Sequence, residues 1–572
     1  MELPNISLRA FWSFLLISSI HVPCFFVSAA HFSHETDRLF LLHLKHMITD
    51  DPLHSMSSWN DTLHFCHWQG VTCGRRHLDR VTALNLTDQN LEKNNTPFIG
   101  NLTFLKIIDL SSNSLEGSIP NSFGQLVRLR WFLLSQNALS GTIPPQLYNI
   151  SSIKALDVGE NRLHGNLPPN LGLTLPNLQI LRVVANQFTG PIPVSLSNSS
   201  GLLLIDLGYN SFTGSVPLNF GSLESLSRLF LSRNQLGIGK AHDLNFLYYL
   251  TNCSELQELD VSNNILSGVL PESLANLSTQ LNFLSLGSNK IFGSIPSGIQ
   301  NLVGLTLMDM VYNFLRGPIP MGVGKPNNLT RSNDLTLVEM ICQGQFHLLW
   351  FIHLNNNNLS GTLPRSLFRI PSLIELRVES NSFTGDLPFE VSYSNALGRF
   401  SVSNNKLSGE IPSRLGSIPP TFTTLKGLRL LDLSRNNLSG KIPRYLEKFA
   451  LEYLNLSFNN FEGELPKRGV FGNISRVSVL GNSKLCGGIP GLQLRPCPSQ
   501  ASKKKGKSLA LKVKLSIIVV LCLLSITSFF TTLYWVRKAR RIPSAEASVE
   551  IKLRRKPLAV PSVEIKLTRK FI

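Results

Sequence analysis

Few residues of this sequence have the types and the spacing that catalysis requires. The 13 histidines are scattered, mostly singly, and there is no H-E-x-x-H metal motif, no G-x-S-x-G nucleophile turn and no phosphate-binding P-loop. One S-x-x-K match, Ser151 to Lys154, falls across the start of a repeated segment and is read as chance. The sequence therefore predicts no enzyme activity, no cofactor and no metal site.

The cysteines have a spacing that suits disulfide bonds. Cys66 and Cys73 lie in one segment without repeats, and Cys486 and Cys497 lie in another. A zinc site is the competing interpretation, but the sequence has no CxxC pair to support it. We expect each pair to form one disulfide at an end of the repeated region.

The element that must position the other side chains is a repeat of the form L-x-x-L-x-L-x-x-N-x-L-x-G-x-I-P. Clear copies run from Leu105 to Pro120 and from Leu129 to Pro144, and most steps are 23 to 25 residues. The motif asparagines are Asn90, Asn113, Asn137, Asn161, Asn186, Asn210, Asn234, Asn264, Asn289, Asn313, Asn357, Asn381, Asn405, Asn436 and Asn459, and Asn482 begins a closing turn. The pattern predicts an α/β repeat solenoid.

The physical logic of the repeat is that each L-x-L segment forms a short strand with its leucines inward. Successive strands then stack about 4.8 Å apart in a parallel sheet on the concave side. Each motif asparagine turns inward and satisfies backbone groups of the bend, so the stacked copies are expected to form an asparagine ladder.

Three steps break this rhythm. The steps from Asn234 to Asn264 and from Asn405 to Asn436 are longer than the rest, and the step from Asn313 to Asn357 contains no readable repeat. The segment 321–348 is open to three interpretations: a degenerate repeat or loop, a loop that contributes to binding, or an altered reading of the gene.

The ends of the repeated region need caps, because an end coil would expose apolar residues. An amphipathic helix from Asp37 to Met47 is expected to offer Leu39, Leu42 and Met47 to the core. Two further cysteines, Cys253 and Cys342, lie several coils apart, too far to be bridged, and are read as unpaired.

Two apolar segments lie outside the repeats. The run from Phe11 to Ile20 and the small residues before His31 predict a signal peptide, and Leu515 to Val536 predicts a transmembrane helix. The expected domains are a signal peptide (1–30), an N-terminal cap (31–80), leucine-rich repeats (81–480), a C-terminal cap (481–502), a basic juxtamembrane segment (503–514), the span (515–536) and a cytoplasmic tail (537–572). The repeats are then extracellular, in a single-pass type I protein of the plasma membrane.

The net charge of +18 is concentrated at the C-terminal end. Residues 503–572 contain 17 Lys and Arg against 3 Glu. A basic run beside an apolar span predicts contact with anionic membrane lipid, and the repeats show no basic stripe with interleaved aromatics that would indicate nucleic acid. We have no physical account of the near-duplication SVEIKLRRK and SVEIKLTRK in the tail.

Side chains between and just after the inward leucines are expected to face the concave surface. Arginine and aromatic residues, the types that anchor interfaces, recur at these positions. The predicted ligand-binding residues are Arg182, Tyr209, Arg228, Phe230, Arg233, Asp309, Tyr312, His353, Arg377 and Glu379, and further candidates on this surface are Arg130, Trp131, Asp206 and Trp350. Aspartates recurring at Asp109, Asp157, Asp206, Asp260, Asp309 and Asp432 are read as a feature of the repeat.

N-glycosylation sequons are frequent in the predicted extracellular part. They are Asn60, Asn85, Asn94, Asn101, Asn149, Asn198, Asn252, Asn276, Asn328, Asn358, Asn437, Asn455 and Asn473. Asn85 and Asn455 fall within predicted concave strands, so glycans there would direct a ligand away from both ends.

From Thr36 to Arg541 the sequence resembles the extracellular region and span of plant leucine-rich-repeat receptor kinases. The resemblance rests on the L-x-G-x-I-P ending, on SWNDTLHFCHWQGVTC and on IGNLTFL. The insertion DLNFLYYLTNCSELQ and the ending GNSKLCGG resemble the subfamily of the bacterial elongation-factor receptor and a rice blight-resistance receptor. In that family a Ser/Thr kinase follows the span, but the 36 residues after Val536 show none of its motifs.

The resemblance implies a receptor-like protein that binds a peptide or protein ligand in plant immune or developmental signalling. A leucine-rich-repeat co-receptor kinase would then supply the signal. Two alternatives stay open: a decoy or inhibitor-type binding protein, and a truncated product of a receptor kinase gene.

Overall fold

The computed structural model describes residues 34–77, 79–94, 100–323, 349–394, 396–412, 427–498 and 501–539. The chain divides into two compact units, Met1–Pro496 and Cys497–Ile572, which we treat separately. The predicted signal peptide, Asn328, Cys342, the unreadable segment from 324 to 348 and the duplicated tail lie outside the described residues.

The first unit is built on one long sheet, and this confirms the predicted solenoid. Apart from the antiparallel pair β1–β2, its strands pair in parallel, each with the strand of the next coil. Its 17 strands among the described residues are β1 (Val71–Cys73), β2 (Val81–Asn85), β4 (Ile107–Asp109), β6 (Trp131–Leu133), β8 (Ala155–Asp157), β10 (Ile180–Arg182), β12 (Leu204–Asp206), β14 (Arg228–Phe230), β16 (Glu258–Asp260), β18 (Phe283–Ser285), β20 (Leu307–Asp309), β22 (Phe351–His353), β24 (Glu375–Arg377), β26 (Arg399–Ser401), β28 (Leu430–Asp432), β30 (Tyr453–Asn455) and β32 (Val477–Ser478).

A second strand follows the ladder asparagine in most coils. These strands form three shorter parallel runs: β3 (Glu92–Asn94), β5 (Ser114–Ser118), β7 (Ala138–Gly141), β9 (Arg162–Asn166), β11 (Gln187–Pro191), β13 (Ser211–Gly214) and β15 (Gln235–Leu236); then β17 (Ser267–Val269), β19 (Lys290–Gly293), β21 (Phe314–Gly317), β23 (Asn358–Gly361), β25 (Ser382–Asp386) and β27 (Lys406–Ser408); and β29 (Ser439–Lys441), β31 (Asn460–Leu465) and β33 (Lys484–Gly487).

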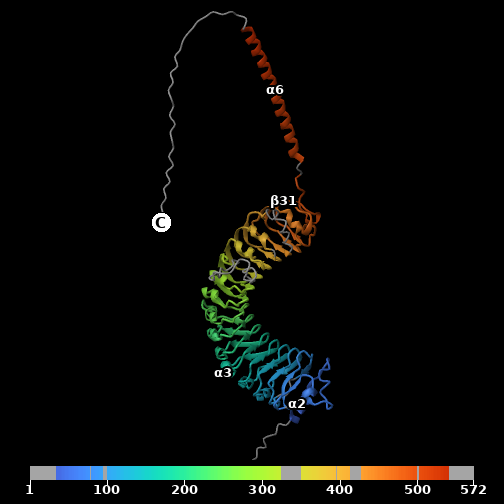
Figure 1. Cartoon of the computed structure of the whole chain (residues 1–572), viewed down its shortest axis with the longest axis vertical. Coiled ribbons are helices and arrows are strands. Elements are labelled where there is room, and N and C mark those ends of the chain that lie inside the picture. The colour runs from blue at the N-terminus through green and yellow to red at the C-terminus, as the bar shows by residue number, and fades with distance from the viewer. Residues whose placement is uncertain are drawn as a thin grey trace, which may run out of the picture. The chain divides into compact units, whose positions relative to one another are not determined.

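Short helical turns complete the coils. They are η1 (Phe65–His67), η2 (Asn121–Gln125), η3 (Leu147–Asn149), α3 (Leu171–Thr174), η4 (Val194–Asn198), η5 (Leu218–Ser222), α4 (Phe246–Tyr249), η6 (Leu250–Asn252), η7 (Glu272–Asn276), η8 (Ser297–Asn301), η9 (Arg365–Arg369), η10 (Phe389–Tyr393), η13 (Arg444–Lys448), η14 (Gly469–Gly472) and η15 (Pro490–Leu492). In Figure 1 the coils of this unit follow an arc, with α3 on its outer side.

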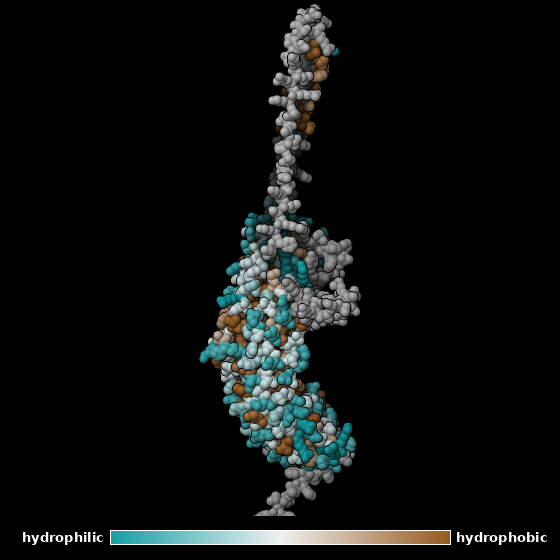
Figure 2. Space-filling view, turned by 60° about the vertical axis from the view of Figure 1, so that its left-hand side comes forward, coloured by the Kyte–Doolittle hydropathy of each residue, from teal (hydrophilic) through white to brown (hydrophobic). Residues whose placement is uncertain are grey.

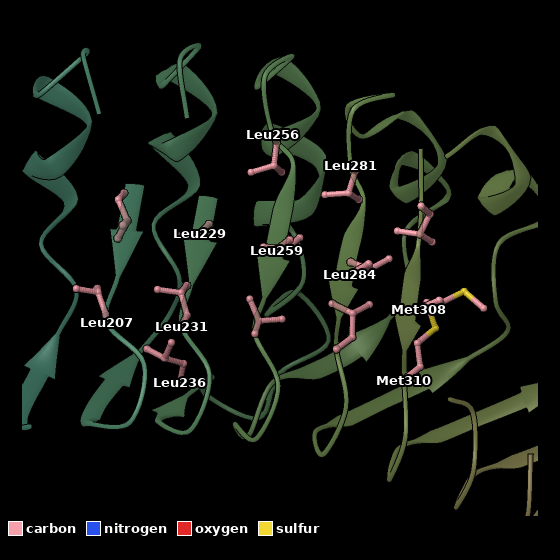
Figure 3. Close-up of a cluster of buried hydrophobic side chains, with 14 of the residues drawn as sticks. Leu207, Leu229, Leu231, Leu236, Leu256, Leu259, Leu281, Leu284, Met308 and Met310 are labelled. Carbon is pink, nitrogen blue, oxygen red and sulfur yellow. The ribbon is translucent and has the colours of Figure 1, made fainter. Parts of the chain in front are cut away.

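The core of the first unit is one continuous stack of repeat leucines. Leu229, Leu231 and Leu259 are fully buried, and Figure 3 shows them in line with their equivalents in neighbouring coils. Met308, on β20, and Met310, just after it, take the same two inward positions. Because each coil's apolar side chains lie against those of the next, no coil is a stable unit by itself.

The asparagine ladder is present. Asn210 illustrates it: its Nδ2 donates to Val183 O at 2.9 Å, Leu207 O at 3.2 Å and Gly208 O at 2.9 Å. Its Oδ1 accepts from the amide of Phe188, in the preceding coil, at 2.9 Å. These bonds satisfy backbone groups that burial would otherwise leave unpaired, at about 1–3 kcal/mol each.

The ladder corrects two sequence assignments. Asn90 is not a ladder residue: it is exposed with φ +53°, and Gln89 holds the ladder position one residue earlier, its Nε2 donating to Thr87 O at 2.7 Å. Asn482, expected only to begin a closing turn, is a full ladder residue, because Phe461 N donates to its Oδ1 at 3.0 Å.

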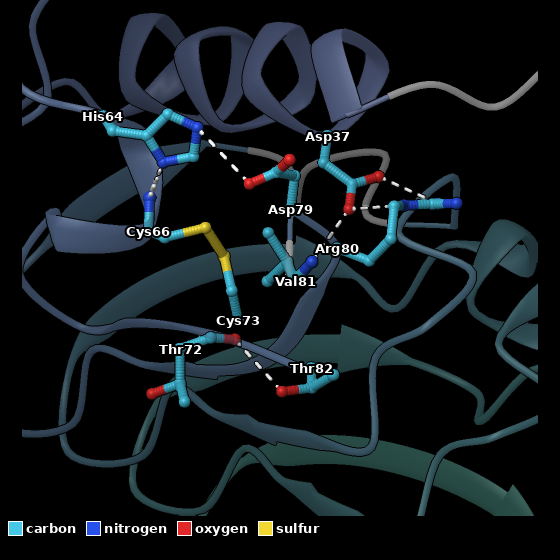
Figure 4. Close-up of a disulfide and its surroundings, with 9 residues drawn as sticks. All are labelled: Asp37, His64, Cys66, Thr72, Cys73, Asp79, Arg80, Val81 and Thr82. Carbon is cyan, nitrogen blue, oxygen red and sulfur yellow. Dashed lines mark hydrogen bonds and ion pairs between the residues drawn. A yellow bond between two sulfur atoms is a disulfide. The ribbon is translucent and has the colours of Figure 1, made fainter. Parts of the chain in front are cut away.

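The N-terminal cap is held by a disulfide and a buried ion pair (Figure 4). Cys66 and Cys73 are bonded, with Cα atoms 5.4 Å apart. Asp37, fully buried on helix α2 (His34–Met47), accepts from Arg80 Nε at 3.0 Å and from Val81 N at 2.8 Å. At the other end of the repeats, Cys486 and Cys497 are also disulfide-bonded.

The helix of this cap is longer than predicted and buries a different face. Leu39 is 55% exposed, so its predicted core role is wrong, while Leu42 and Met47 are half-buried. Leu41 and Leu44 fill the core instead. Their spacing of three residues follows the helical period, and the buried Asp37 fixes which side faces the repeats.

The second unit contains the helix α6 (Ala501–Ala539). Its segment Val513–Lys538 is, among the described residues, the one helix long and apolar enough to cross a membrane. It contains the predicted span 515–536. Figure 2 shows hydrophobic residues on this helix, whereas the visible side of the repeats mixes hydrophilic and hydrophobic residues.

Candidate ligand-binding face

The candidate site is the face of the long sheet that points away from the core, which we call the concave face. Parallel register places equivalent residues of successive coils side by side. Asp206 pairs with Phe230, and Asp309 with His353, which in turn pairs with Arg377. Residues about 24 apart in sequence therefore act together on this face.

The first group of predicted residues centres on Arg182, the middle of a three-coil ion network. Its guanidinium contacts Asp157 Oδ2 at 2.9 Å and Asp206 Oδ2 at 3.5 Å. Both aspartates are 8% exposed. Burial raises the pKa of Asp206, while the Gly208 amide and Arg182 act in the opposite direction. Arg182 therefore compensates two carboxylates that would otherwise repel each other.

Tyr209 and Arg233 form an exposed pair in neighbouring coils. The Arg233 guanidinium carbon lies 4.7 Å from the Tyr209 ring centroid, within the range of a cation–π contact. Each directly precedes a ladder asparagine and has a left-handed backbone, with φ of +53°. Ala185 occupies the same position with φ +52°, so alanine is accommodated there. Close to this pair, Arg228 Nε lies 3.4 Å from Glu258 Oε1, and Phe230 is half-buried.

The second group lies beyond two coils without predicted residues. His353 Nε2 is 3.5 Å from Glu375 Oε1, and Arg377 contacts Glu379 Oε1 at 2.8 Å. Tyr312, at the same left-handed position as Tyr209, is 59% exposed. The ten predicted residues therefore form two groups on one face, and five of them lie within ion-pair distance of a partner in the chain: Arg182, Arg228, His353, Arg377 and Glu379.

The recurring aspartates have a structural role. Asp309 Oδ1 accepts from the backbone amide of Val311 at 3.1 Å, and Asp432 Oδ1 from that of Ser434 at 3.0 Å. Asn455 makes the same bond to Ser457 N at 3.2 Å. This side-chain turn closes the strand in the coils that carry an aspartate or asparagine at this position, which agrees with the reading of these aspartates as a repeat feature.

Sequence reasoning missed Lys106 and Lys154 on this face. They flank Arg130 at intervals of 24 residues, and each directly precedes a strand of the long sheet. Comparing equivalent positions of successive repeats, rather than single repeats, would have found them.

The described sequons mostly avoid the strands of the concave face. Asn149, Asn198, Asn252 and Asn276 are exposed at the ends of η3, η4, η6 and η7. Asn101, Asn60, Asn358, Asn437 and Asn473 also lie outside the long sheet, whereas Asn85 and Asn455 end β2 and β30 as expected. The side chain of Asn94 is not described.

The buried thiol of Cys253 offers no nucleophile. It is fully buried and its Sγ lies 3.5 Å from Phe220 O, and burial raises its pKa to about 11. A thiol with such a pKa is protonated at neutral pH and reacts slowly. The prediction that it is unpaired is confirmed.

Comparisons with known proteins agree with this architecture. The leucine rich repeat N-terminal domain model matches residues 34–74, and leucine rich repeat models match 79–139, 255–277, 280–302 and 413–461. Among curated proteins, the chain is 54% identical to the receptor kinase-like protein Xa21 of Oryza sativa subsp. japonica over 86 residues, 15% of this chain and 8% of that protein.

Two Arabidopsis thaliana proteins are also similar. The chain is 47% identical to the LRR receptor-like serine/threonine-protein kinase EFR over 83 residues, 14% of this chain and 8% of the kinase. It is 32% identical to Receptor-like protein 39 over 257 residues, 41% of this chain and 27% of that protein. The matches thus span less than a third of each relative.

Among solved structures, a crystal structure of PEPR1-AtPEP1 superposes with a TM-score of 0.53 at 28% identity, covering 80% of this chain and 68% of that chain. A crystal structure of a TDR receptor gives a TM-score of 0.54 at 28% identity, covering 70% and 76%. This chain therefore contains leucine-rich repeats, and over the repeat region it is similar to plant leucine-rich-repeat receptor kinases and receptor-like proteins.

Proposed function

We propose that the chain is a cell-surface receptor-like protein of the plant plasma membrane that binds a peptide or protein ligand on its concave face. Signalling then comes from partner kinases, among them a leucine-rich-repeat co-receptor, in immune or developmental responses. The similarity to Xa21 and EFR, both named as receptor kinases, supports this class. The apolar segment of α6 supports membrane anchoring.

The observation that carries the proposal is the exposed aromatic and arginine surface around Tyr209, Arg233 and Tyr312. Tyr209 and Tyr312 are 51% and 59% exposed, although each is held on a rigid strand-to-turn position by the ladder asparagine that follows it. Rigid, exposed aromatic side chains lose little entropy on binding and are frequent anchors of interfaces.

The test is a binding screen with labelled microbial and endogenous plant peptides on the full chain in nanodiscs. For a peptide that binds, Tyr209→Ala and Tyr312→Ala are expected to weaken affinity about 5- to 30-fold each, the usual range for an interface anchor. Ala185 shows that the backbone accepts this substitution. Unchanged affinity in both variants and in Arg233→Ala would rule out this part of the face as the binding site.

A decoy or inhibitor is distinguished by a second measurement. Co-precipitation of a leucine-rich-repeat co-receptor kinase with the chain is compared with and without the bound peptide. A receptor recruits the co-receptor only with ligand, whereas a decoy binds the ligand and recruits nothing.

A further inference from the structure

Three consecutive coils carry a cation at the same position of the concave face. Lys106, Arg130 and Lys154 directly precede β4, β6 and β8, and we call these three residues the basic stripe. Their backbones are joined: Arg130 N donates to Lys106 O at 2.8 Å, and Lys154 N to Arg130 O at 2.7 Å. Neighbouring strands of a parallel sheet lie about 4.8 Å apart, so the stripe is about 10 Å long.

The cations of the basic stripe are not held in ion pairs within the described part of the chain. Two other arginines of the concave face, Arg182 and Arg377, contact carboxylates at 2.9 and 2.8 Å. None of the three stripe cations forms an ion pair with a described carboxylate. Three like charges at this spacing repel one another, and a bound anion would relieve that repulsion.

The stripe begins and ends abruptly. The equivalent residue of the coil before it is Thr82, and that of the coil after it is Gln179, both uncharged. Lys106 N donates to Thr82 O at 2.8 Å and Gln179 N to Lys154 O at 2.7 Å, so both neighbours are in register with it. The consecutive run of cations is therefore three coils long.

Apolar side chains lie beside the cations. Ile107 and Trp131, the first residues of β4 and β6, are 38% and 36% exposed and lie in register. A few residues before them in the same two coils, the Arg128 guanidinium carbon lies 4.1 Å from the Phe104 ring centroid. The surface therefore offers an apolar platform and a line of donors, which suits a ligand that carries both apolar side chains and carboxylates.

We propose that the basic stripe binds an acidic segment of a peptide, with its carboxylates against Lys106, Arg130 and Lys154 and an apolar side chain on Trp131 and Ile107. An extended peptide advances about 3.4 Å per residue, so the stripe matches about three to four residues. The inference rests on the proposed function, which it deepens by assigning a charge to one end of the ligand.

The experiment uses the full chain in nanodiscs and a labelled short peptide of glutamates flanking one phenylalanine. Fluorescence anisotropy at low salt is expected to show binding that weakens about tenfold or more at physiological salt, because exposed charges are screened. The variant Lys106→Glu/Arg130→Glu/Lys154→Glu is expected to lose at least about tenfold in affinity, and Trp131→Ala a few-fold.

The matched control reverses three cations elsewhere on the chain. Lys290, Arg316 and Lys406 are exposed on β19, β21 and β27 and have no described ion pair, so Lys290→Glu/Arg316→Glu/Lys406→Glu changes the net charge equally. It is expected to keep the affinity for the probe. Equal loss in both triple variants, or no loss in the stripe variant with an unchanged melting temperature, would overturn the proposal.

A competition arm tests the class of ligand. Unlabelled polygalacturonate that displaces the probe at a lower carboxylate concentration than unlabelled peptide would replace the peptide assignment with an acidic polysaccharide. The result for the basic stripe does not depend on Tyr209 and Tyr312, which lie outside the stripe. If substitutions at these two tyrosines leave peptide affinity unchanged, the stripe can still be shown to bind the acidic probe.

Discussion

Two regions of the concave face use the same residue types in opposite ways. In the coils of β8 to β12, Arg182 is neutralised by Asp157 and Asp206, so its charge serves the fold. In the coils of β4 to β8, Arg130 lies between two further cations and forms no ion pair with a described carboxylate. An arginine on a repeat surface therefore identifies a binding position only when the coils on both sides fail to compensate it.

The largest expected effect tests whether both regions share one framework. Asn137→Ala and Asn210→Ala are each expected to destabilise the chain by about 3 kcal/mol, because each leaves three carbonyls and one amide of two coils without their partner. Urea unfolding of the full chain followed by circular dichroism measures this. A clearly smaller cost for Asn137 would mean that the two regions differ in framework as well as in charge.

Next comes the contrast between the arginines themselves. Arg182→Ala should cost about 1–2 kcal/mol, because Asp157 and Asp206, on the strands at either side of β10, would be left buried without a cation. Arg130→Ala should change stability by less than about 0.5 kcal/mol, as is usual for an unpaired surface residue. Equal costs for both substitutions, measured in the same urea experiment, would contradict the comparison.

Asp309, in the second group of predicted residues, allows a pH test of how a buried carboxylate is stabilised on this face. Asp309→Asn keeps the acceptor for Val311 N, as Asn455 does for Ser457, whereas Asp309→Ala should lose about 1 kcal/mol. Burial raises the pKa of Asp309 in the folded protein, so folding favours the protonated form. Wild type should therefore gain stability relative to Asp309→Asn as pH falls through the interval between the raised pKa and the ordinary value near 3.8.

The smallest effect concerns the exposed aromatic pair. A double-mutant cycle of Tyr209→Ala and Arg233→Ala is expected to give a coupling of about 0.5–1 kcal/mol, the usual size of an exposed cation–π contact. Arg435 and Phe458, with 4.9 Å between guanidinium and ring centroid at the same repeat position, provide a replicate. Coupling near zero in both would show that these pairs are free to rearrange around a ligand.

The repeat frame was predictable because its period places each leucine and asparagine in an unambiguous position. The ladder position of the first coil was predicted wrongly, because Gln89 replaces the ladder asparagine and Asn90 follows it directly. The ion pairs could be predicted in part from the sequence. Asp157, Arg182 and Asp206 follow one another at steps of 25 and 24 residues, which is the spacing of neighbours in adjacent coils. The pairing of Asp309 with His353 was hidden, because 44 residues separate them in the sequence.

The cap helix could not be oriented from its sequence. Its apolar residues are close together, from Leu39 to Leu44, and allow more than one buried side. What decides the orientation is the bond from Asp37 to Arg80 and Val81, which are more than 40 residues away.

The direction of the ladder bonds has a consequence for biogenesis. Each ladder asparagine completes the coil made before it: Asn234 accepts from Phe212 N and donates to Leu207 O, both upstream. A chain that emerges from the ribosome N-terminus first can therefore finish one coil each time about two dozen residues appear. At any moment only the newest coil lacks its ladder bonds to the next asparagine. Asn482 supplies these bonds for the last coil described, through Phe461 N and Leu456 O.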